Sequence, residues 1–360
     1  MKARMFYAAG LVVAVAFAIG IITVSIERST PTAGFGEPSY IIDSTSYTEA
    51  VTSDTGQRFD LSNDPLPMDT VELDFSAVSC VSIQDGKAIA GSEGGMYIYD
   101  PVDSSTQIIS VENGLMDHHV TALYPSEAGI YIGTETGLFL RDEFGLITPV
   151  IPELQTTVTA IAEIGGEVYI GTEYEGVVKL SGDEFSRMID VQSVTSLALG
   201  GGMMWVGTDG CGLYSYDGIK ARKRFLDSDS TAFDIVSSLG YNHNHLYAGT
   251  PQGMWVFDGG RWELYDGDDG LIECDITAIS FRGWKILAGT RTWGYYEIFE
   301  DFVKPLSWSE GMTVTCMASN DSMVVFGTPG DGIFIEIDGK VTNVNPEPES
   351  VQIPVYALDP

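Results

Sequence analysis

A Gly-Thr or Gly-Ser pair recurs seven times along this 360-residue chain. An apolar or aromatic residue stands two places before each pair, and a second glycine follows within five residues. The pairs are Gly91-Ser92, Gly133-Thr134, Gly171-Thr172, Gly207-Thr208, Gly249-Thr250, Gly289-Thr290 and Gly327-Thr328. A period of about 40 residues is typical of folds in which every repeat is one supersecondary unit. The repeat therefore constrains the fold more strongly than any single motif.

Each repeat holds four segments with the pattern of β-strands. The first, such as residues 120–123, precedes the pair, the second ends in the pair, and the third, such as 254–257, alternates after the second glycine. A weaker fourth segment follows, for example 262–265. The third residue of the first strand is always small: Cys80, Ala122, Ala160, Ser196, Ser238, Ala278 or Cys316. This pattern predicts the blade of a β-propeller, with the first strand crowded around the axis.

Seven copies predict an all-β fold, a seven-bladed β-propeller. Residues 355–358 repeat the first-strand pattern once more, so an eighth blade completed by N-terminal strands stays an alternative. Residues 71–75 alternate in period two and are expected to close the ring as the outer strand of the last blade. Ring closure would make Cys80 and Cys316 neighbours, and two small packed thiols are favoured there over a disulfide.

The N-terminus carries a membrane signal. Lys2 and Arg4 precede an uncharged run over residues 5–26, which as a helix is long enough to cross a bilayer. The positive charges keep this end in the cytoplasm and place the rest of the chain outside it. Cleavage at Ala16-Phe17-Ala18 would instead secrete the chain. We expect a single N-terminal transmembrane helix in the cell membrane, with the propeller in the periplasm or the extracellular space.

The segment between the N-terminal apolar run and the repeats differs in composition from both. Residues 29–70 are rich in Ser, Thr, Asp and Glu, and Arg58 is their only basic residue. Such a stretch cannot bury enough apolar surface to offset its ordering entropy, so we expect a flexible acidic stalk. An anchor or signal peptide over residues 1–28 then precedes the stalk, and the propeller spans 71–360. The net charge of −33 excludes nucleic acid as a main partner and disfavours an anionic membrane surface.

Some repeats show a longer consensus. Gly114-Leu115 precedes the first strand at 120–123, which is followed by Gly133-Thr134 and Gly137-Leu138. This pattern resembles the two-component regulator propeller family, and the resemblance covers about residues 76–345. It implies a seven-bladed propeller, which in that family is often the extracytoplasmic sensor of a membrane histidine kinase. This chain departs from that plan because no kinase domain accompanies the repeats, so the resemblance implies an exported ring that binds a ligand or partner.

The residue after the pair is acidic in the first four repeats: Glu93, Glu135, Glu173 and Asp209. These positions fall in the turn between the second and third strands, at the end of the ring where the chain also enters each first strand. We call this end the loop face. Four neighbouring carboxylates suit a cation or a basic partner. Because tight turns favour acidic residues, a purely structural role is the alternative.

A second acidic cluster precedes the first strand of the sixth repeat and contains Asp266, Asp268 and Asp269. Carboxylates at this density suit Ca²⁺, which takes several oxygen ligands. The run does not have the spacing of an EF-hand loop, and part of it belongs to the ordinary repeat, so a turn without metal is the alternative. No other cofactor is indicated.

Aromatic and cationic residues on the loop face are the best candidates for a small binding site. Arg291 and Trp293 lie in the turn between the second and third strands of the sixth repeat, and Trp308 lies in a segment that leads into a first strand. An exposed indole at these places would stack on a sugar or anchor a protein partner. Packing against the rim of the blades is the alternative.

The sequence contains no Walker loop, no H-E-x-x-H and no G-x-S-x-G motif. We therefore expect no enzyme activity. The expected function is that of a membrane-tethered, exported propeller that binds a protein partner or a glycan on its loop face, as scaffold, assembly factor or sensory module. The alternative is an exported carbohydrate-active or calcium-dependent enzyme, which needs convergent carboxylates near the axis.

Overall fold

The computed structural model of the chain describes residues 6–8, 11–18, 21–28, 51–52, 58–59 and 68–354, apart from residues 183, 225–233 and 300–301. Side chains are described from Glu72 to Ser350, with the same gaps. The chain divides into two compact units, Met1–Leu66 and Pro67–Pro360.

The described part of the first unit consists of short antiparallel strands. The strands β1 (Phe6–Ala8), β2 (Leu11–Ala18) and β3 (Ile21–Arg28) form one sheet, and β4 (Val51–Thr52) pairs with β5 (Arg58–Phe59). Val, Ile and Thr are frequent in this segment, and β-branched side chains favour extended backbone. No helix among the described residues is long and apolar enough to cross a bilayer, so the transmembrane helix expected over residues 5–26 is not confirmed. Most of the expected stalk over 29–70 lies outside the described residues.

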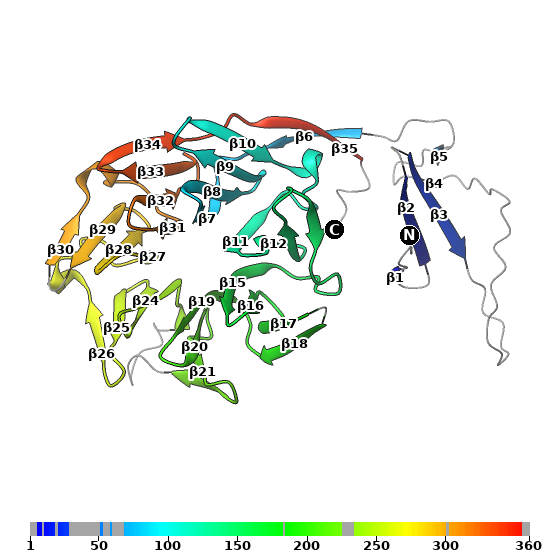
Figure 1. Cartoon of the computed structure of the whole chain (residues 1–360). Coiled ribbons are helices and arrows are strands. Elements are labelled where there is room, and N and C mark those ends of the chain that lie inside the picture. Colours follow the sequence, from blue (N-terminus) through cyan, green and yellow to red (C-terminus); the bar gives the residue numbers. More distant parts are fainter. Residues whose placement is uncertain are drawn as a thin grey trace. The chain divides into compact units, whose positions relative to one another are not determined.

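The second unit is a seven-bladed β-propeller, as the repeats predict (Figure 1). Every blade is a four-stranded antiparallel sheet whose strands pair in chain order, and the first strand of a blade lies nearest the axis. Blade 1 contains β7 (Val78–Gln84), β8 (Lys87–Ser92), β9 (Gly95–Asp100) and β10 (Ser105–Ile109). Blade 2 contains β11 (Val120–Ser126), β12 (Gly129–Thr134), β13 (Leu138–Arg141) and β14 (Ile147–Pro149). Blade 3 contains β15 (Val158–Ile164), β16 (Glu167–Thr172), β17 (Val177–Ser181) and β18 (Glu184–Ile189).

The remaining blades have the same plan. Blade 4 contains β19 (Val194–Gly200), β20 (Met203–Thr208), β21 (Leu213–Tyr216) and β22 (Ala221–Arg224). Blade 5 contains β23 (Ser238–Asn242), β24 (His245–Thr250), β25 (Gly253–Phe257) and β26 (Trp262–Tyr265). Blade 6 contains β27 (Ile276–Arg282), β28 (Lys285–Thr290), β29 (Tyr295–Phe299) and β30 (Phe302–Pro305). Blade 7 contains β31 (Cys316–Ser319), β32 (Met323–Gly327), β33 (Ile333–Ile337) and β34 (Lys340–Val344). Short 3₁₀ helices, η1 (Val111–Asn113), η3 (Gly267–Asp269) and η4 (Ser307–Ser309), precede blades 2, 6 and 7.

The glycine of each repeated pair is required where two blades meet. A Cβ at Gly133 would lie 2.7 Å from Cγ1 of Val158 in blade 3, and a Cβ at Gly327 would lie 2.6 Å from Cγ1 of Val78 in blade 1. The same clash with a Val or Ile of the next blade arises at Gly91, Gly171, Gly207, Gly249 and Gly289. The absence of a side chain therefore lets each first strand pack tightly against the preceding blade.

The hydroxyl residue of the pair closes the turn that follows it. In all seven blades this side chain is buried. Thr172 Oγ1 donates a hydrogen bond of 2.9 Å to the carbonyl of Gly176. The equivalent donors are Ser92, Thr134, Thr208, Thr250, Thr290 and Thr328, each bonded to the second glycine of its repeat. The pair and the second glycine thus form one structural unit, which explains why they recur together.

A hydroxyl at the second position of the first strand links neighbouring blades. Thr121 Oγ1 donates to the carbonyl of Val158 at 2.6 Å, and Thr315 Oγ1 donates to the carbonyl of Val78 at 2.7 Å. The second of these bonds joins blade 7 to blade 1. Ser79, Thr195 and Thr277 donate to the next blade in the same way. The ring is therefore joined near its axis by side-chain hydrogen bonds in addition to apolar packing.

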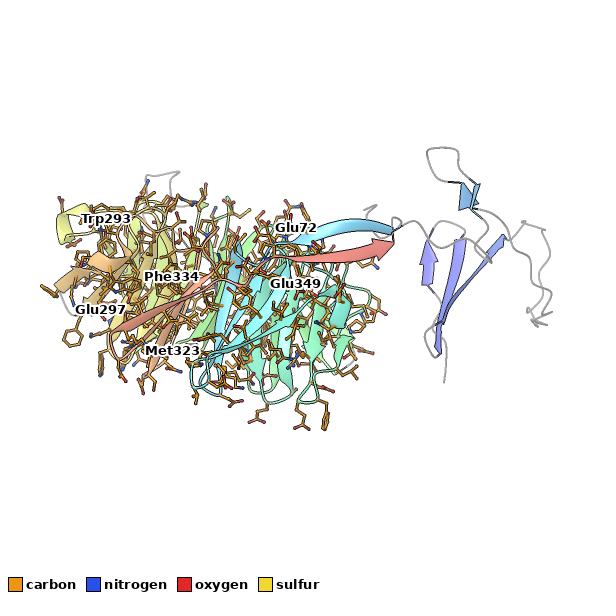
Figure 2. All side chains as sticks on the ribbon, turned by 90° about the horizontal axis from the view of Figure 1, so that it is seen from above. Glu72, Trp293, Glu297, Met323, Phe334 and Glu349 are labelled. Carbon is orange, nitrogen blue, oxygen red and sulfur yellow. The ribbon has the colours of Figure 1, made fainter. Side chains whose placement is uncertain are left out.

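The two ends of the propeller pair with each other. The strands β6 (Met68–Leu73) and β35 (Glu349–Pro354) form a separate two-stranded antiparallel sheet, seen in Figure 1 and marked in Figure 2 by Glu72 and Glu349. The expected pairing of chain start with chain end is confirmed. The expected partner is wrong, because β34 already supplies the fourth strand of blade 7. Residues 355–358, the candidate start of an eighth blade, lie outside the described residues.

The hydrophobic core lies mainly between successive blades. At the closing seam, where blades 7 and 1 meet, Leu73 and Phe75 belong to one buried cluster with residues of both blades. The Phe75 side chain is fully buried, and its ring packs edge-on against Tyr97 at a centroid distance of 6.4 Å. The segment that follows β6 therefore fills the space between the first and last blades.

Candidate binding surfaces

The ring has two different ends. Turns between second and third strands and the segments leading into first strands lie on the loop face, whereas the hairpin turns between first and second strands lie on the opposite end, the turn face. Figure 2 views the ring edge-on, with Trp293 toward the loop face and Met323 toward the turn face. Contacts across the loop face confirm this arrangement, since His119 before β11 lies 2.7 Å from Glu135 in the turn after β12.

The four acidic residues after the pairs form an arc on blades 1 to 4 of the loop face, which we call the acidic arc. Glu93, Glu135 and Asp209 are exposed, and Glu173 is half-buried. Glu135 Oε1 is paired with His119 Nδ1, and the backbone carbonyl of Glu93 lies 2.9 Å from His118 Nδ1. Among the described residues, no group of three or more His, Cys, Asp or Glu side chains is arranged to hold a metal ion. The arc is therefore an extended acidic surface.

The aspartates at 266, 268 and 269 shape a helix terminus. The Asp266 side chain accepts a hydrogen bond from the Asp268 amide at 2.8 Å, and the Asp269 side chain accepts one from the Asp266 amide at 3.1 Å. This reciprocal capping box fixes the start of η3 and satisfies amides that would otherwise lack partners. The density of carboxylates is thus explained by local backbone structure, and calcium binding there stays a prediction.

Arg291 and Trp293 lie together in the turn between β28 and β29. Arg291 is exposed, and its guanidinium pairs with the carboxylate of Asp275, which raises the pKa of Arg291. The Thr292 hydroxyl donates to the Glu273 carboxylate beside this pair. Trp293 is half-buried against the core of blades 5 and 6. The sequence thus located a polar cluster on the loop face, although its charges are already paired within the chain.

Trp308 is not the exposed indole that its position indicated. It lies in η4 and packs against Tyr295 and Phe326, with ring centroids 5.7 Å away in both cases, and against Phe334 at 6.5 Å. The half-buried Trp308 belongs to the core between blades 6 and 7. Its contacts with three strands of two blades, rather than its place in a loop, determine its exposure.

A buried polar network crosses the same pair of blades. The Tyr295 hydroxyl donates to Glu336 Oε2 at 2.5 Å, and Arg282 Nη1 lies 3.5 Å from Glu336 Oε1. Burial, followed by the neighbouring Glu336 carboxylate, raises the pKa of Tyr295. Tyr295 therefore stays protonated and acts as a donor to the buried carboxylate. The network links blades 6 and 7 and replaces the water that an isolated charge would need.

Cys80 and Cys316 are free thiols, as expected. Burial raises the pKa of Cys316 to about 12. Burial also raises the pKa of Cys80, and the neighbouring Cys316 adds to this effect. Two thiols with raised pKa values are poor nucleophiles at neutral pH, so the pair fills space at the closing seam.

A groove on the turn face was not predicted from the sequence. It has a volume of about 640 Å³ and lies between blades 5 and 6, with His243 and Trp284 in its lining. Both residues occupy the hairpin turn between first and second strands, one in each of two successive repeats. That register was the available signal, because equivalent turns of neighbouring blades must lie close together in a ring.

The fold and these surfaces define a seven-bladed β-propeller with an acidic loop face. No protein-family model and no curated protein matches the sequence. The extracellular domain of the hybrid two-component system BT4673 from B. thetaiotaomicron matches with a TM-score of 0.62 and 18% identity, over 75% of this chain and 39% of that one. PorZ, a bacterial surface component of the type-IX secretion system of Porphyromonas gingivalis, matches with a TM-score of 0.60 and 14% identity, over 77% of this chain and 39% of PorZ. Virginiamycin B lyase from Staphylococcus aureus matches with a TM-score of 0.59 and 11% identity, over 74% of this chain and 98% of the lyase.

At these identities the likeness shows the fold alone. This chain spans about two fifths of the BT4673 domain and of PorZ. Those two proteins are extracellular or surface components, whereas the lyase is an enzyme of similar fold. The propeller is therefore similar in fold to parts of an extracellular domain and of a surface component, and to an enzyme.

Proposed function

We propose that this chain is an extracytoplasmic binding module whose loop face holds a protein partner with a basic surface. The acidic arc carries this proposal. Its carboxylates belong to consecutive blades of one rigid ring, and those of Glu93 and Asp209 make no ion pair or hydrogen bond with any other described residue. Unpaired carboxylates on a fixed scaffold give a surface that attracts and orients positive charge.

A binding role is also supported by the way the loop face uses its other charges. Arg291 is held by Asp275, and the aspartates near η3 cap backbone amides. These groups stabilise turns, whereas the carboxylates of Glu93 and Asp209 in the arc have no such role among the described residues. We therefore propose a scaffold, assembly factor or sensory module rather than an enzyme. The relation to the two-component regulator propeller family is part of this proposal and rests on the repeat motifs and the shared fold.

Membrane tethering completes the proposal. Residues 5–26 are uncharged and follow Lys2 and Arg4, which is the arrangement of a single-pass anchor with its N-terminus in the cytoplasm. The propeller would then face the periplasm or the extracellular space. Similarity to an extracellular domain and a surface component supports this location.

Capture from native membranes tests the partner. The full chain, tagged and solubilised in detergent, is used as bait beside a variant with Glu93→Gln, Glu135→Gln, Glu173→Gln and Asp209→Asn. The control carries Asp85→Asn, Glu127→Gln, Glu143→Gln and Asp321→Asn, which neutralise four exposed carboxylates on the turn face. Both variants have the same net charge, so a difference between them reports the face and not the total charge.

The expected result is one stoichiometric protein whose capture falls at least tenfold in the arc variant and is retained by the control. Added salt should weaken the capture by wild type, because exposed charge pairs are screened. Equal capture by both variants would exclude the arc as the binding surface. Absence of any stoichiometric protein would contradict the proposed partner class.

A further inference from the structure

The groove between blades 5 and 6 has the dimensions and lining of a ligand site. Its volume of about 640 Å³ falls within the range of about 300–1,000 Å³ that is usual for small-molecule sites. Aromatic side chains and charged side chains both line it, and the lining includes His243 and Trp284 in hairpin turns of the turn face. The acidic arc lies on the opposite end of the ring, so the groove is separate from the surface proposed above.

Trp284 forms an aromatic platform that two hairpin turns hold in place. The imidazole of His243 stacks on its indole, with ring centroids 3.4 Å apart and an interplanar angle of 22°. Asn242 Nδ2 donates to the carbonyl of Gly283 at 2.9 Å, which ties the turn of blade 5 to the turn of blade 6. His243 has a φ of 47°, in the left-handed region that non-glycine residues seldom adopt. Asn244 is left-handed as well, with a φ of 64°, as the two central residues of a type I′ hairpin turn must be.

The platform is accessible despite this support. Trp284 is 68% exposed, because His243 can cover only one face of the indole. Farther along the groove, Phe299 is 44% exposed, and Tyr247 is half-buried. Burial raises the pKa of Tyr247, so its hydroxyl stays protonated and can donate a hydrogen bond. The groove thus presents flat apolar faces next to polar groups.

Charged groups on blade 5 border the aromatic surface and partly neutralise one another. Arg261 Nε lies 3.6 Å from Asp258 Oδ2, and Arg261 Nη2 lies 4.0 Å from Glu263 Oε2. The amides of Arg261 and Gly260 donate to Asp258, which lowers its pKa and keeps it ionised. The groove therefore offers carboxylate acceptors and guanidinium donors with little net charge.

We propose that this groove binds a neutral saccharide. The C–H groups on one face of a pyranose ring carry slight positive charge and pack on the negative face of an indole. Sugar hydroxyls both donate and accept, so they match the carboxylates of Asp258 and Glu263 and the guanidinium of Arg261. A purely apolar ligand would desolvate those charges without replacing their hydrogen bonds. An anionic ligand would be disfavoured by a chain of net charge −33, because the guanidinium of Arg261 is already paired with two carboxylates.

Affinity electrophoresis of the full chain tests the proposal. The protein is purified in a polyoxyethylene detergent, because glucoside and maltoside detergents would compete for the site. Gels contain mannan, arabinoxylan, laminarin or amylose, and a probe that retards the protein is followed by calorimetric titration with its oligosaccharides. Wild type should be retarded by at least one of these four probes.

Three variants locate the site. Trp284→Ala should weaken binding at least tenfold, and Glu263→Gln should weaken it severalfold by removing a charged acceptor. Phe144→Ala removes an 87% exposed aromatic ring from blade 2 and should leave binding unchanged. Since Trp284 is exposed, the Trp284→Ala variant should have the same melting temperature as wild type. The Glu263→Gln variant tests the same groove without changing the size of a side chain. The arc variant described above should bind the saccharide normally, so failure of one proposal is distinguishable from failure of the other.

The proposal is overturned if none of the four polysaccharides retards the protein, or if Trp284→Ala and Glu263→Gln bind as wild type does. Loss of a captured protein in Trp284→Ala, without any polysaccharide binding, would instead identify the groove as a protein-docking surface.

Discussion

The seam between blades 7 and 1 and the seam between blades 5 and 6 are built alike near the axis. In the first, the repeat glycine Gly327 leaves room for Val78, and in the second Gly249 leaves room for Ile276. Both contacts would be replaced by a clash if a Cβ were added. This inner part of each seam is a property of the repeat and is the same wherever two blades meet.

The two seams differ farther from the axis. Phe75, which precedes the first repeat, is fully buried in the closing seam, whereas Trp284 stands 68% exposed at the groove between blades 5 and 6. A residue from outside the repeats thus seals one seam, and two hairpin-turn residues line the opening of the other. The comparison teaches that the repeat builds the ring, while residues that do not recur decide where the ring offers a site.

Removal of Phe75 should have the largest effect on this contrast. Phe75→Ala leaves a cavity against Tyr97 and should lower the free energy of unfolding by about 3–5 kcal/mol. Trp284→Ala, at the open seam, should change it by about 0.5 kcal/mol or less. Urea unfolding followed by circular dichroism measures both. Equal losses would show that the two seams are sealed to the same degree.

A Cβ at the inner part of either seam should have an intermediate effect. Gly327→Ala and Gly249→Ala place a methyl group within 3 Å of the next blade and should each cost about 1–3 kcal/mol. Gly330→Ala is the matched control, because nothing lies within 4 Å of the added carbon. In thermal unfolding, Gly330→Ala should have the same melting temperature as wild type. A ring that tolerates Gly327→Ala but not Gly249→Ala would refute the equivalence of the inner seams.

Among the contacts between blades, the smallest effect is expected from the hydroxyl that crosses the closing seam. Thr315→Val removes the bond to the Val78 carbonyl and should cost about 0.5–1.5 kcal/mol. Thr159 holds the same repeat position in blade 3, but its buried hydroxyl has no partner among the described residues. Thr159→Val should therefore be neutral or stabilising, and chemical unfolding of the two variants side by side tests this. Similar destabilisation of both would mean that the inter-blade bond contributes nothing specific.

The repeat made most of the fold predictable. A period of about 40 residues sets four strands for each blade. The recurring Gly-Thr pair marked the place where the blades touch, which the clash of Gly133 with Val158 explains. Closure was harder, since the choice of β35 over β34 as the partner of residues 68–73 depends on pairing between distant segments. The N-terminal helix expected from hydropathy and length is not confirmed, because no helix among the described residues is long and apolar enough to cross a bilayer.

The candidate sites were less predictable, because exposure depends on neighbours in other blades. Trp308 was placed in a loop correctly, yet three aromatic rings from blades 6 and 7 cover it. Trp284 was passed over, although its turn is equivalent to that of His243 in the preceding repeat. Comparison of equivalent turns in successive repeats, rather than inspection of single loops, would have found the platform.

The bond from Thr315 to Val78 spans 237 residues of sequence. During synthesis Val78 emerges long before Thr315 follows, so the first blade must wait without its last neighbour. During that interval Phe75 has no cavity to fill, and β6 has an unpaired edge on which another chain could add a strand. Contacts between distant segments also form slowly. The end of the chain therefore decides when its beginning is protected, and a helper that shields the early strands during synthesis would shorten the period of greatest risk.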